Sequence, residues 1–297
     1  MVKITFLGTS DSIPSAERNP TSILITHGGE NILLDCGEGT QRQFRKAKLN
    51  PCKITRVLIT HWHGDHVLGL PGLLQTLALS GYSKTLVISG PRGTKQFMKN
   101  LFKTFAFKQE GKIKIEEVDG KFFETDDFYL EARKMTHGIS CNAYNFVKKG
   151  KLRIDRDKLK KSKLPSGPLL KKLKEGKNIS YKGKKYLAKN LTYQEGEKKL
   201  SFVFDTSANK FIVPFVKNSD LLVSESTFNS ELEEKAKKHN HLTAKQAAEI
   251  AKKSKSKKLI LTHVSQRYEK EPKKILNDAQ KVFKNSFVVR DLDIIEI

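Results

Sequence analysis

The sequence predicts an α/β protein with one long basic insertion, and three observations lead to this prediction. Short apolar runs alternate with helical patterns along most of the 297 residues, which is the layout of α/β proteins. This length lies near the upper end of what one hydrophobic core serves, so one domain over residues 1–297 with an insertion is as acceptable as two domains. The third observation is a strongly basic, weakly apolar stretch at residues 150–197.

The predicted elements follow one another in a regular order after an opening strand and turn in MVKITFLGTS. The further strand candidates are TRVLIT (55–60), SFVFDTS (201–207), DLLVSEST (220–227) and KKLILTH (257–263). Helical patterns follow at residues 68–81 and 243–254. Thr243 and Gln246 form a capping-box pattern at the start of the second helix, so we expect His241 on a loop just before it.

Composition indicates a soluble globular chain, with 37% hydrophobic and 30% charged residues. No apolar run approaches the ~20 residues of a membrane span, and the N-terminus lacks a secretory signal, so we expect no membrane association and a cytoplasmic location. The three cysteines Cys36, Cys52 and Cys141 contain no C-x-x-C pair. They therefore predict buried reduced thiols, with neither a disulfide framework nor a thiolate zinc site.

The net charge of +24 is concentrated in one segment. Between Lys148 and Lys199, nineteen basic residues stand against five acidic ones, which gives +14 in 52 residues. Such an excess favours a polyanionic partner through counterion release, although an anionic membrane surface would satisfy the same charge. Because apolar residues are sparse here, we expect a protruding arm at residues 150–197 with little core of its own. The alternative is a solvated basic loop without a specific task.

A cluster of metal-ligand side chains follows the strand candidate TRVLIT. Three imidazoles and one carboxylate lie within the six residues from His61 to His66, a set suited to zinc or a similar transition ion. His137, Asp205 and His263 also follow apolar strand candidates. His137 or Asp205 alone would more often be a structural or capping residue, but strand ends gather at one edge of an α/β sheet. Together these residues provide enough ligands for two metals.

The motif H-x-H-x-D-H, with a later His, Asp and His, resembles the metallo-β-lactamase superfamily over nearly the whole chain. The resemblance implies an αββα sandwich with a dinuclear site at its edge. It also implies one zinc ion on His61, His63 and His137, a second on Asp65, His66 and His263, and a bridge through Asp205. Asp65 would serve as a ligand and as the proton acceptor for the attacking water. Such a site suits phosphodiester hydrolysis, because paired metal ions lower the pKa of bound water and clamp an in-line displacement.

Further segments resemble the short form of the ribonuclease Z family, the tRNA 3′-processing endoribonucleases. Pro14, Arg18 and Asn19 match its P-x-K-x-R-N signature, with Ala16 in place of the lysine, and Gly167-Pro168 matches the Gly-Pro motif of its flexible tRNA-binding arm. Two loops and a C-terminal signature also match, at Ser224–Thr227, His241–Thr243 and Thr262–Tyr268. Ser224 and Leu242 depart from the family pattern, as Ala16 does.

The resemblance implies roles for the matched residues. His241 would protonate the leaving oxygen or stabilise the transition state, and Glu225 would orient it. The residues expected to bind substrate are Arg18, Asn19, Gly167, Pro168, Thr243 and Arg267. The alternative interpretation is that His241 is a surface residue beside a helix cap, without a catalytic role.

The implied function is zinc-dependent removal of the 3′ trailer from precursor tRNA. The products would be a tRNA 3′-hydroxyl and a 5′-phosphate on the trailer. The implied cofactor is two Zn²⁺ ions per subunit, with Mn²⁺ or another divalent ion as an alternative, and the implied assembly is a homodimer. One alternative is a general phosphodiesterase or DNA-processing nuclease of the same superfamily. An alternative of another class is an RNA-binding protein with a vestigial metal site.

Overall fold

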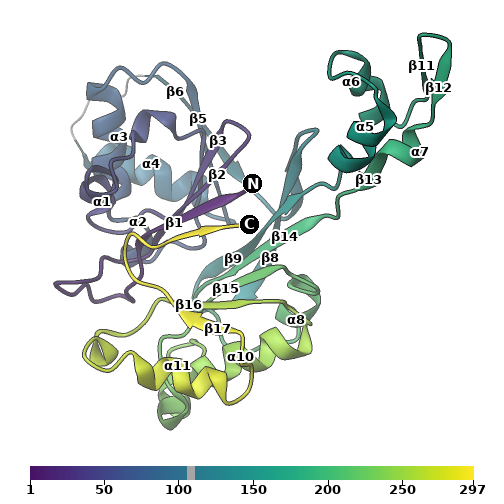
Figure 1. Cartoon of the computed structure of the whole chain (residues 1–297). Helices are drawn as coiled ribbons and strands as arrows, with labels where there is room; N and C mark the ends of the chain where they lie inside the picture. The colour runs from purple at the N-terminus through teal and green to yellow at the C-terminus, as the bar shows by residue number, and fades with distance from the viewer. Residues whose placement is uncertain (106–110) are drawn as a thin grey trace.

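Two mixed β-sheets face each other in the computed structural model, which describes residues 1–105 and 111–297 (Figure 1). The first sheet has the strand order β18-β1-β2-β3-β4-β5-β6. Its strands are β1 (Lys3–Gly8), β2 (Ser22–His27), β3 (Glu30–Leu34), β4 (Arg56–Leu58), β5 (Thr85–Gly90), β6 (Lys112–Glu117) and β18 (Ile294–Glu296). The strands from β3 to β6 are parallel, so their carboxyl ends lie at one edge. The pairing of β1 with β18 brings the two ends of the chain together.

The second sheet has the strand order β17-β16-β15-β14-β9-β8-β7. Its strands are β7 (Gly120–Glu124), β8 (Phe128–Thr136), β9 (Ser140–Lys148), β14 (Lys198–Val203), β15 (Leu221–Glu225), β16 (Leu259–Thr262) and β17 (Ser286–Val288). The strands from β14 to β17 are parallel, and β7, β8 and β9 add to β14 in antiparallel pairs. Asp205 and His263 therefore follow parallel strands at the same edge of this sheet.

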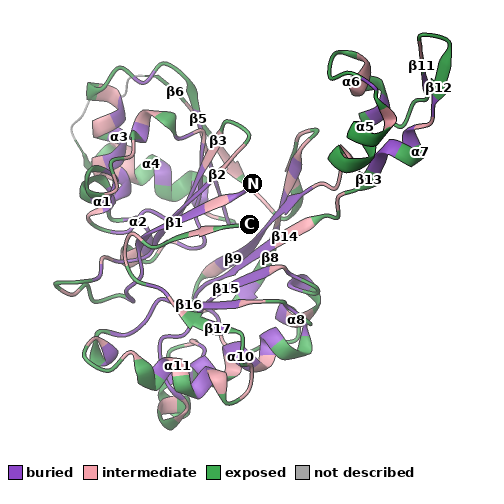
Figure 2. Cartoon of the chain, in the orientation of Figure 1, coloured by how far each residue is buried: buried purple, intermediate pink, exposed green. Residues whose placement is uncertain are grey.

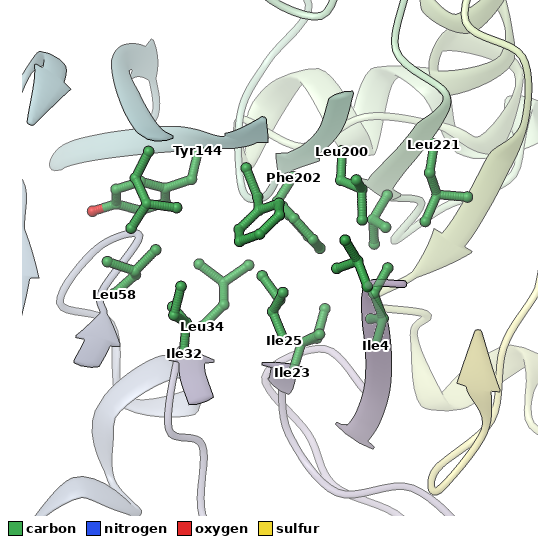
Figure 3. Close-up of a cluster of buried hydrophobic side chains, with 14 of the residues drawn as sticks. Ile4, Ile23, Ile25, Ile32, Leu34, Leu58, Tyr144, Leu200, Phe202 and Leu221 are labelled. Atoms are coloured by element: carbon green, nitrogen blue, oxygen red, sulfur yellow. The ribbon is translucent and has the colours of Figure 1, made fainter. Parts of the chain in front are cut away.

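The central core lies between the two sheets, where aliphatic and aromatic side chains from both inner faces meet (Figure 3). Alternation along the strands produces this arrangement. Ile23 and Ile25 of β2 point into the central core, whereas Leu24 between them joins a second core on the outer face. Phe202 of β14 lies opposite in the central core and is 1% exposed. The central strands of each sheet are therefore buried on both faces, and this explains their nearly continuous apolar sequences.

Helices cover both outer faces, which confirms the predicted αββα sandwich (Figure 1). On the first sheet these are α1 (Thr40–Lys46), α3 (Leu70–Leu79) and α4 (Thr94–Thr104), and on the second α8 (Ile212–Phe215), α10 (Ala244–Lys253) and α11 (Lys273–Gln280). Shorter elements are α2 (Gly64–Val67), α9 (Glu233–Lys238) and the 3₁₀ turns Pro51–Lys53, Ser230–Leu232 and Gln266–Tyr268. Leu73 and Leu77 of α3 belong to the same outer core as Leu33 of β3, and Ala247 of α10 belongs to the same outer core as Leu222 of β15. The predicted capping box of α10 is confirmed.

Residues 149–197 form an arm that projects from the sandwich (Figure 1). The arm leaves at the end of β9 and returns at the start of β14, where Lys148 pairs with Lys198. It contains β10 (Leu152–Ile154), α5 (Arg156–Ser162), α6 (Leu169–Lys174), β11 (Ile179–Tyr181), β12 (Lys184–Tyr186), α7 (Ala188–Leu191) and β13 (Thr192–Gln194). Most of its surface is exposed (Figure 2).

The arm has a small core, which its composition did not predict. Leu164, Leu173, Ile179, Tyr186, Ala188 and Leu191 are buried together. Five of them come from the four elements α6, β11, β12 and α7, and Leu164 follows α5, so neither a helical nor a strand period joins them in the sequence. The sequence therefore led us to underestimate the apolar core of the arm, because tertiary packing brings together apolar residues that are far apart along the chain.

None of the helices in the described part of the chain has the length and apolar character that a bilayer crossing requires. Cys36 and Cys141 are buried free thiols, as predicted, whereas the free thiol of Cys52 is only half-buried.

Candidate metal centre and active site

The H-x-H-x-D-H segment forms a tight turn between β4 and α2. The buried strand β4 ends at Leu58, and the loop that follows it lies at the edge of the first sheet where the carboxyl ends of the parallel strands meet. The short helix α2 starts at Gly64, with His63 as its N-cap in an extended conformation. His61 and His63 thus precede the helix while Asp65 and His66 lie on it, and the Nε2 atom of His66 is 3.2 Å from Oδ2 of Asp65.

His137, Asp205 and His263 join this turn from the second sheet. They follow β8, β14 and β16, as expected from the strand-end rule. Oδ2 of Asp205 is 3.5 Å from Nε2 of His61 and 3.5 Å from Nε2 of His66. Its Oδ1 is 3.1 Å from Nε2 of His263. The carboxylate of Asp205 therefore lies at the centre of the cluster.

Besides a third group of Glu225, His241 and His263, the side chains form two groups that share one residue and could each hold a metal ion. One contains His61, His63, His137 and Asp205, and the other contains Asp65, His66, Asp205 and His263. Within each group the ligand atoms lie within 4.8 Å of one another. Asp205 is shared, which is the arrangement of a bridging carboxylate. These groups are the two sets expected from the sequence.

Three buried polar atoms support the fit of divalent metal ions. Among the described residues, Nε2 of His66, Oδ1 of Asp205 and Nε2 of His263 make no hydrogen bond. Leaving such atoms unpaired in a protein interior is costly. Imidazole nitrogen and carboxylate oxygen are ligands of zinc and similar ions, so metal coordination would remove this cost. The residues therefore fit a site for divalent metal ions.

The charges of the cluster also suit ligation. Burial disfavours the charge of Asp205, but the neighbouring imidazoles, His263 first, hold its pKa well below the ordinary value. Burial lowers the pKa of His61 well below its usual value and also lowers the pKa of His137, so both rings are neutral and free to ligate. Burial alone would lower the pKa of His66, but Asp205 and Asp35 raise it well above the usual value. A metal must displace that proton, so its affinity should increase with pH.

Asp35 is a buried residue at this site that sequence reasoning missed. Its Oδ2 lies 2.7 Å from Nδ1 of His66 and accepts a hydrogen bond from Oγ1 of Thr60 at 2.8 Å. Its Oδ1 accepts the backbone N–H of Thr60 at 2.7 Å. The carboxylate thereby orients His66 with Nε2 towards the metal groups. The sequence feature that could have identified Asp35 is its position directly after the strand-like segment NILL. The same pattern identified Asp205.

Three residues at the site have left-handed backbone conformations. The φ angles are 55° at Asp35, 39° at Asp205 and 54° at His263. Residues other than glycine rarely adopt this region, and such conformations concentrate at functional sites. Here each turns the chain sharply after a strand, so that the side chain points into the cluster.

His241 lies beside the metal groups and is held by Glu225. Nδ1 of His241 is 3.0 Å from Oε2 of Glu225, which also accepts a hydrogen bond from Oγ1 of Thr227 at 2.7 Å. Glu225 is fully buried, and its Oε1 accepts the N–H of Thr206. Burial would lower the pKa of His241, but Glu225 raises it to about 9. His241 therefore holds a proton more firmly than an ordinary imidazole, and its Nδ1, fixed by Glu225, lies 4.0 Å from Oδ2 of Asp205.

The structure separates most of the expected substrate-binding residues from this centre. Buried Arg18 donates to Oγ1 of Thr9 at 2.7 Å and to the carbonyl of Val289 at 2.8 Å, so it braces a loop. The side chain of Asn19 likewise donates to the carbonyl of Glu38. Other parts of the protein thus hold both side chains, and their contact with substrate stays a prediction.

The remaining expected residues divide into three places. Thr243 is buried, and its hydroxyl accepts the N–H of Gln246, so it caps α10. Gly167 and Pro168 lie in the arm, directly before α6. Arg267 alone lines a cleft together with His241.

Comparisons with known proteins place the chain among nucleases of this fold. Residues 2–146 match a protein family described as "Anti-Pycsar protein Apyc1". Ribonuclease Z of Archaeoglobus fulgidus is 36% identical over 302 residues, which cover 100% of this chain and 98% of that protein. Ribonuclease Z of Methanothermobacter thermautotrophicus is 37% identical over 300 residues, with 100% and 97% covered.

Two solved structures share the architecture. The human tRNase Z, short form, is 26% identical, with a TM-score of 0.73 over 99% of both chains. The metallo-β-lactamase fold protein YhfI from Bacillus subtilis is 20% identical, with a TM-score of 0.72 over 100% of this chain and 99% of that one. The match to residues 2–146 contains the H-x-H-x-D-H segment and His137 but ends before the arm, Asp205 and His263. The full-length relatives cover all of these.

Proposed function

The chain belongs to the ribonuclease Z family of tRNA 3′-processing endonucleases, and from this premise we propose how its own residues perform the reaction. The proposed reaction is hydrolysis of the phosphodiester that joins the last nucleotide of the tRNA to its 3′ trailer. The single observation that carries it is the pair of metal groups sharing Asp205, with His241 and Glu225 beside them.

We propose that two Zn²⁺ ions occupy the two groups. His61, His63 and His137 would hold one ion, Asp65, His66 and His263 the other, and Asp205 both. When bound, such ions supply an activated water and a positive field for the phosphodiester. Mn²⁺ or another divalent ion would serve with the same nitrogen and oxygen ligands.

The proton transfers fall to two side chains. The pKa of Asp65 is far below the usual range, because His66 and His263 outweigh the effect of its burial, so Asp65 is ionised and able to ligate. We propose that it also accepts the proton of the attacking water. His241 would donate a proton to the leaving O3′ from the nitrogen that Glu225 does not hold. The trailer then keeps the phosphate at its 5′ end, and the tRNA ends in a 3′-hydroxyl.

We propose that the arm binds tRNA at a distance from the cut. The strand β9 starts beside the metal centre at Ser140 and ends at the arm after nine residues, a separation of roughly 27 Å. The excess of +14 between Lys148 and Lys199 suits RNA phosphates, and A-form RNA is recognised mainly by shape and backbone. Because the arm points away from its own metal centre, we further propose a homodimer in which the arm of one subunit serves the site of the other. Precursor tRNA as substrate also favours a cytoplasmic location.

The test is a cleavage assay on precursor tRNA with and without a trailer. The zinc-loaded protein should release the trailer once, leaving a tRNA 3′-hydroxyl and a trailer 5′-phosphate that end-specific ligation detects. Asp65→Ala should abolish this reaction and also hydrolysis of bis(p-nitrophenyl) phosphate, while Asp119→Ala, which removes an exposed carboxylate, should change neither.

Two outcomes would contradict the proposal. Near wild-type turnover by a zinc-replete Asp65→Ala protein would exclude the proposed role of Asp65. Efficient hydrolysis of bis(p-nitrophenyl) phosphate together with cleavage at many RNA positions would instead favour a general phosphodiesterase.

A further inference from the structure

The arm joins the sandwich through a junction that belongs to neither of two neighbouring strand ladders. The ladder between β9 and β14 ends where Lys148 pairs with Lys198. The ladder of the arm, between β10 and β13, starts where Leu152 pairs with Gln194. A short segment of each strand lies between the two ladders (Figure 1). The direction of the arm is therefore set at this junction and not by a continuous sheet.

A glycine lies on each strand of the junction. A Cβ atom on Gly150 would lie 2.5 Å from the carbonyl oxygen of Glu195 and 3.2 Å from the amide nitrogen of Glu197, so any other residue would push the strands apart. Gly196 lies on the opposite strand. Because glycine has wide conformational freedom, the backbone alone does not fix the direction of the arm.

The side chain of Glu195 crosses the junction. The N–H of Glu195 extends the ladder of the arm, since it donates to the carbonyl of Lys151 at 2.9 Å. Its Oε1 accepts a hydrogen bond from Nζ of Lys148, the last residue of β9, at 3.1 Å. Its Oε2 accepts one from Nε of Arg153 in β10 at 2.7 Å. One carboxylate thus joins a cation of the sandwich to a cation of the arm.

The burial of Lys148 makes this contact stronger than an ion pair on an open surface. The side chain of Lys148 is 9% exposed, and a buried cation is costly without a counter-charge. Glu195 is the one carboxylate that pairs with Lys148 in the part of the chain that the structure describes. Arg153 and Lys148 lower the pKa of Glu195, so this side chain is ionised at neutral pH.

The turn between β7 and β8 supports the other strand of the junction. Lys151 forms an ion pair with Asp127, and the N–H of Lys149 donates to the carbonyl of Asp127 at 2.8 Å. Nζ of Lys149 lies 2.6 Å from Oε1 of Glu124. The side chains of these pairs are much more exposed than that of Lys148. Each pair therefore contributes less to the position of the arm than Glu195 does.

We propose that Glu195 is a positioning residue for precursor tRNA, because it holds the arm at a fixed angle to the sandwich. This step rests on the proposed function, in which the arm binds the tRNA that a metal centre cuts. One tRNA meets both places only when their separation matches the RNA, so an arm already held at the matching angle loses less conformational freedom on binding. An arm released at its base would occupy many angles, and only the competent fraction would capture substrate.

The sign of the effect distinguishes this role from simple electrostatics. Glu195→Gln removes a negative charge from a basic arm, so electrostatic attraction alone would tighten tRNA binding. Release of the arm should weaken it. Glu175→Gln is the matched control, because Glu175 is also an exposed carboxylate of the arm and lies 2.9 Å from Nζ of Lys177, but both partners belong to the arm.

The first measurement is of kcat and KM on precursor tRNA. The proteins are the wild type, Glu195→Gln, Lys148→Met, the double variant and Glu175→Gln. Methionine keeps the buried stem of Lys148 without its charge. Zinc content and hydrolysis of bis(p-nitrophenyl) phosphate check the folding of each protein.

The second measurement records the angle of the arm without RNA. Spin labels are attached at Lys185→Cys in the arm and at Lys99→Cys on α4, both exposed positions, in a protein that also carries Cys52→Ser because the Cys52 thiol is half-buried and free. Pulsed electron paramagnetic resonance then gives the distribution of distances between the labels. Dilution with unlabelled protein restricts the signal to distances within one subunit.

The expected result is a change in KM and not in kcat. Glu195→Gln should raise KM for precursor tRNA roughly 3- to 10-fold, the population shift that loss of one partly exposed ion pair allows, with unchanged hydrolysis of bis(p-nitrophenyl) phosphate. Lys148→Met should do the same, and the double variant should lose no more than either. Glu175→Gln should leave KM unchanged or lower it. The distances should be narrowly distributed in the wild type and in Glu175→Gln, and broadly in Glu195→Gln.

Three results would overturn the inference. They are an unchanged or lower KM for Glu195→Gln, a distance distribution of this variant as narrow as that of the wild type, and losses that multiply in the double variant with Lys148→Met. Failure of the wild type to bind or cleave precursor tRNA would refute the proposed function itself. The label distances would still show whether Glu195 holds the arm, because that measurement contains no RNA.

Discussion

Asp35→Asn tests how the protein prepares His66 for a metal. In the wild type, Oδ1 of Asp35 accepts the backbone N–H of Thr60, and Oδ2 lies 2.7 Å from Nδ1 of His66. An asparagine that keeps its carbonyl on the Thr60 N–H must present its amide –NH₂ to His66. The ring then carries its hydrogen on Nε2, which is the nitrogen that faces the metal groups, so this hydrogen must leave before the ring can ligate.

The size of the effect follows from the lost interaction. A hydrogen bond to a charged group contributes about 1.5–3 kcal/mol, which corresponds to roughly a 10- to 150-fold loss of metal affinity. Loss of a partner that orients a metal-binding histidine typically costs about 10- to 100-fold, so the two estimates agree. Because the metal ligands themselves remain, saturating zinc should restore most of the turnover.

The assay is a zinc titration against a competing chelator, read both as bound metal and as cleavage rate. The rate curve of Asp35→Asn should move to higher zinc by that factor and approach the wild-type plateau. Asp220→Asn is the matched control, because Asp220 also accepts a backbone N–H and pairs with Lys198 but lies away from the site. Unchanged zinc affinity, or a loss of activity that excess zinc does not restore in a folded protein, would refute the reasoning.

Four further predictions concern other parts of the chain. His241→Ala should keep both metals but lose roughly 10²–10⁴-fold in turnover, and loss of metal from this variant would contradict the assignment. Glu225→Gln should lower the pKa of His241 from about 9, so the loss of activity at alkaline pH should begin at lower pH. An unchanged pH profile of Glu225→Gln would contradict the role of Glu225. Replacing residues 151–196 with a Gly/Ser linker should weaken tRNA binding and flatten its salt dependence, with little effect on the hydrolysis of bis(p-nitrophenyl) phosphate. If the arm acts across a dimer, mixing this armless protein with the Asp65→Ala protein should restore processing. Equal losses of activity on both substrates would contradict a binding role of the arm. Burial raises the pKa of Asp291 to about 6, so the native state takes up this proton more readily than the unfolded state. In urea unfolding, the wild type should gain stability over Asp291→Asn as the pH falls from 7 towards 4. Parallel curves of unfolding free energy against pH for the two proteins would contradict this.

The fold and the clustering of the metal ligands were predictable because their signals are local. The H-x-H-x-D-H segment lies within six residues, and each of the other candidates follows an apolar run that the structure shows as a strand. The capping box at Thr243 is local in the same sense. Strand ends in such sheets gather at one edge, so the clustering of His137, Asp205 and His263 required no knowledge of the pairing.

The features that the sequence did not reveal depend on contacts between distant segments. The role of Asp35 arises because β3 and β4 pair in parallel, which sets Asp35 beside Thr60. Arg18 matches a family motif, but its carbonyl partner, Val289, is 271 residues away, so the motif could not show that the side chain is buried. The core of the arm also depends on contacts between residues that are far apart in the sequence.

The left-handed conformations of Asp35, Asp205 and His263 connect the lifetime of the protein with its metal supply. Each such conformation costs on the order of 1–3 kcal/mol, against a total stability of about 5–15 kcal/mol for a typical domain. A metal bound only by the native state, at a free concentration one hundred times its dissociation constant, returns about 2.7 kcal/mol. A cell depleted of that metal would therefore lose more than catalysis, because the strained apoprotein would open more often and be degraded sooner. The amount of enzyme, and not only its occupancy, would then follow the supply of metal.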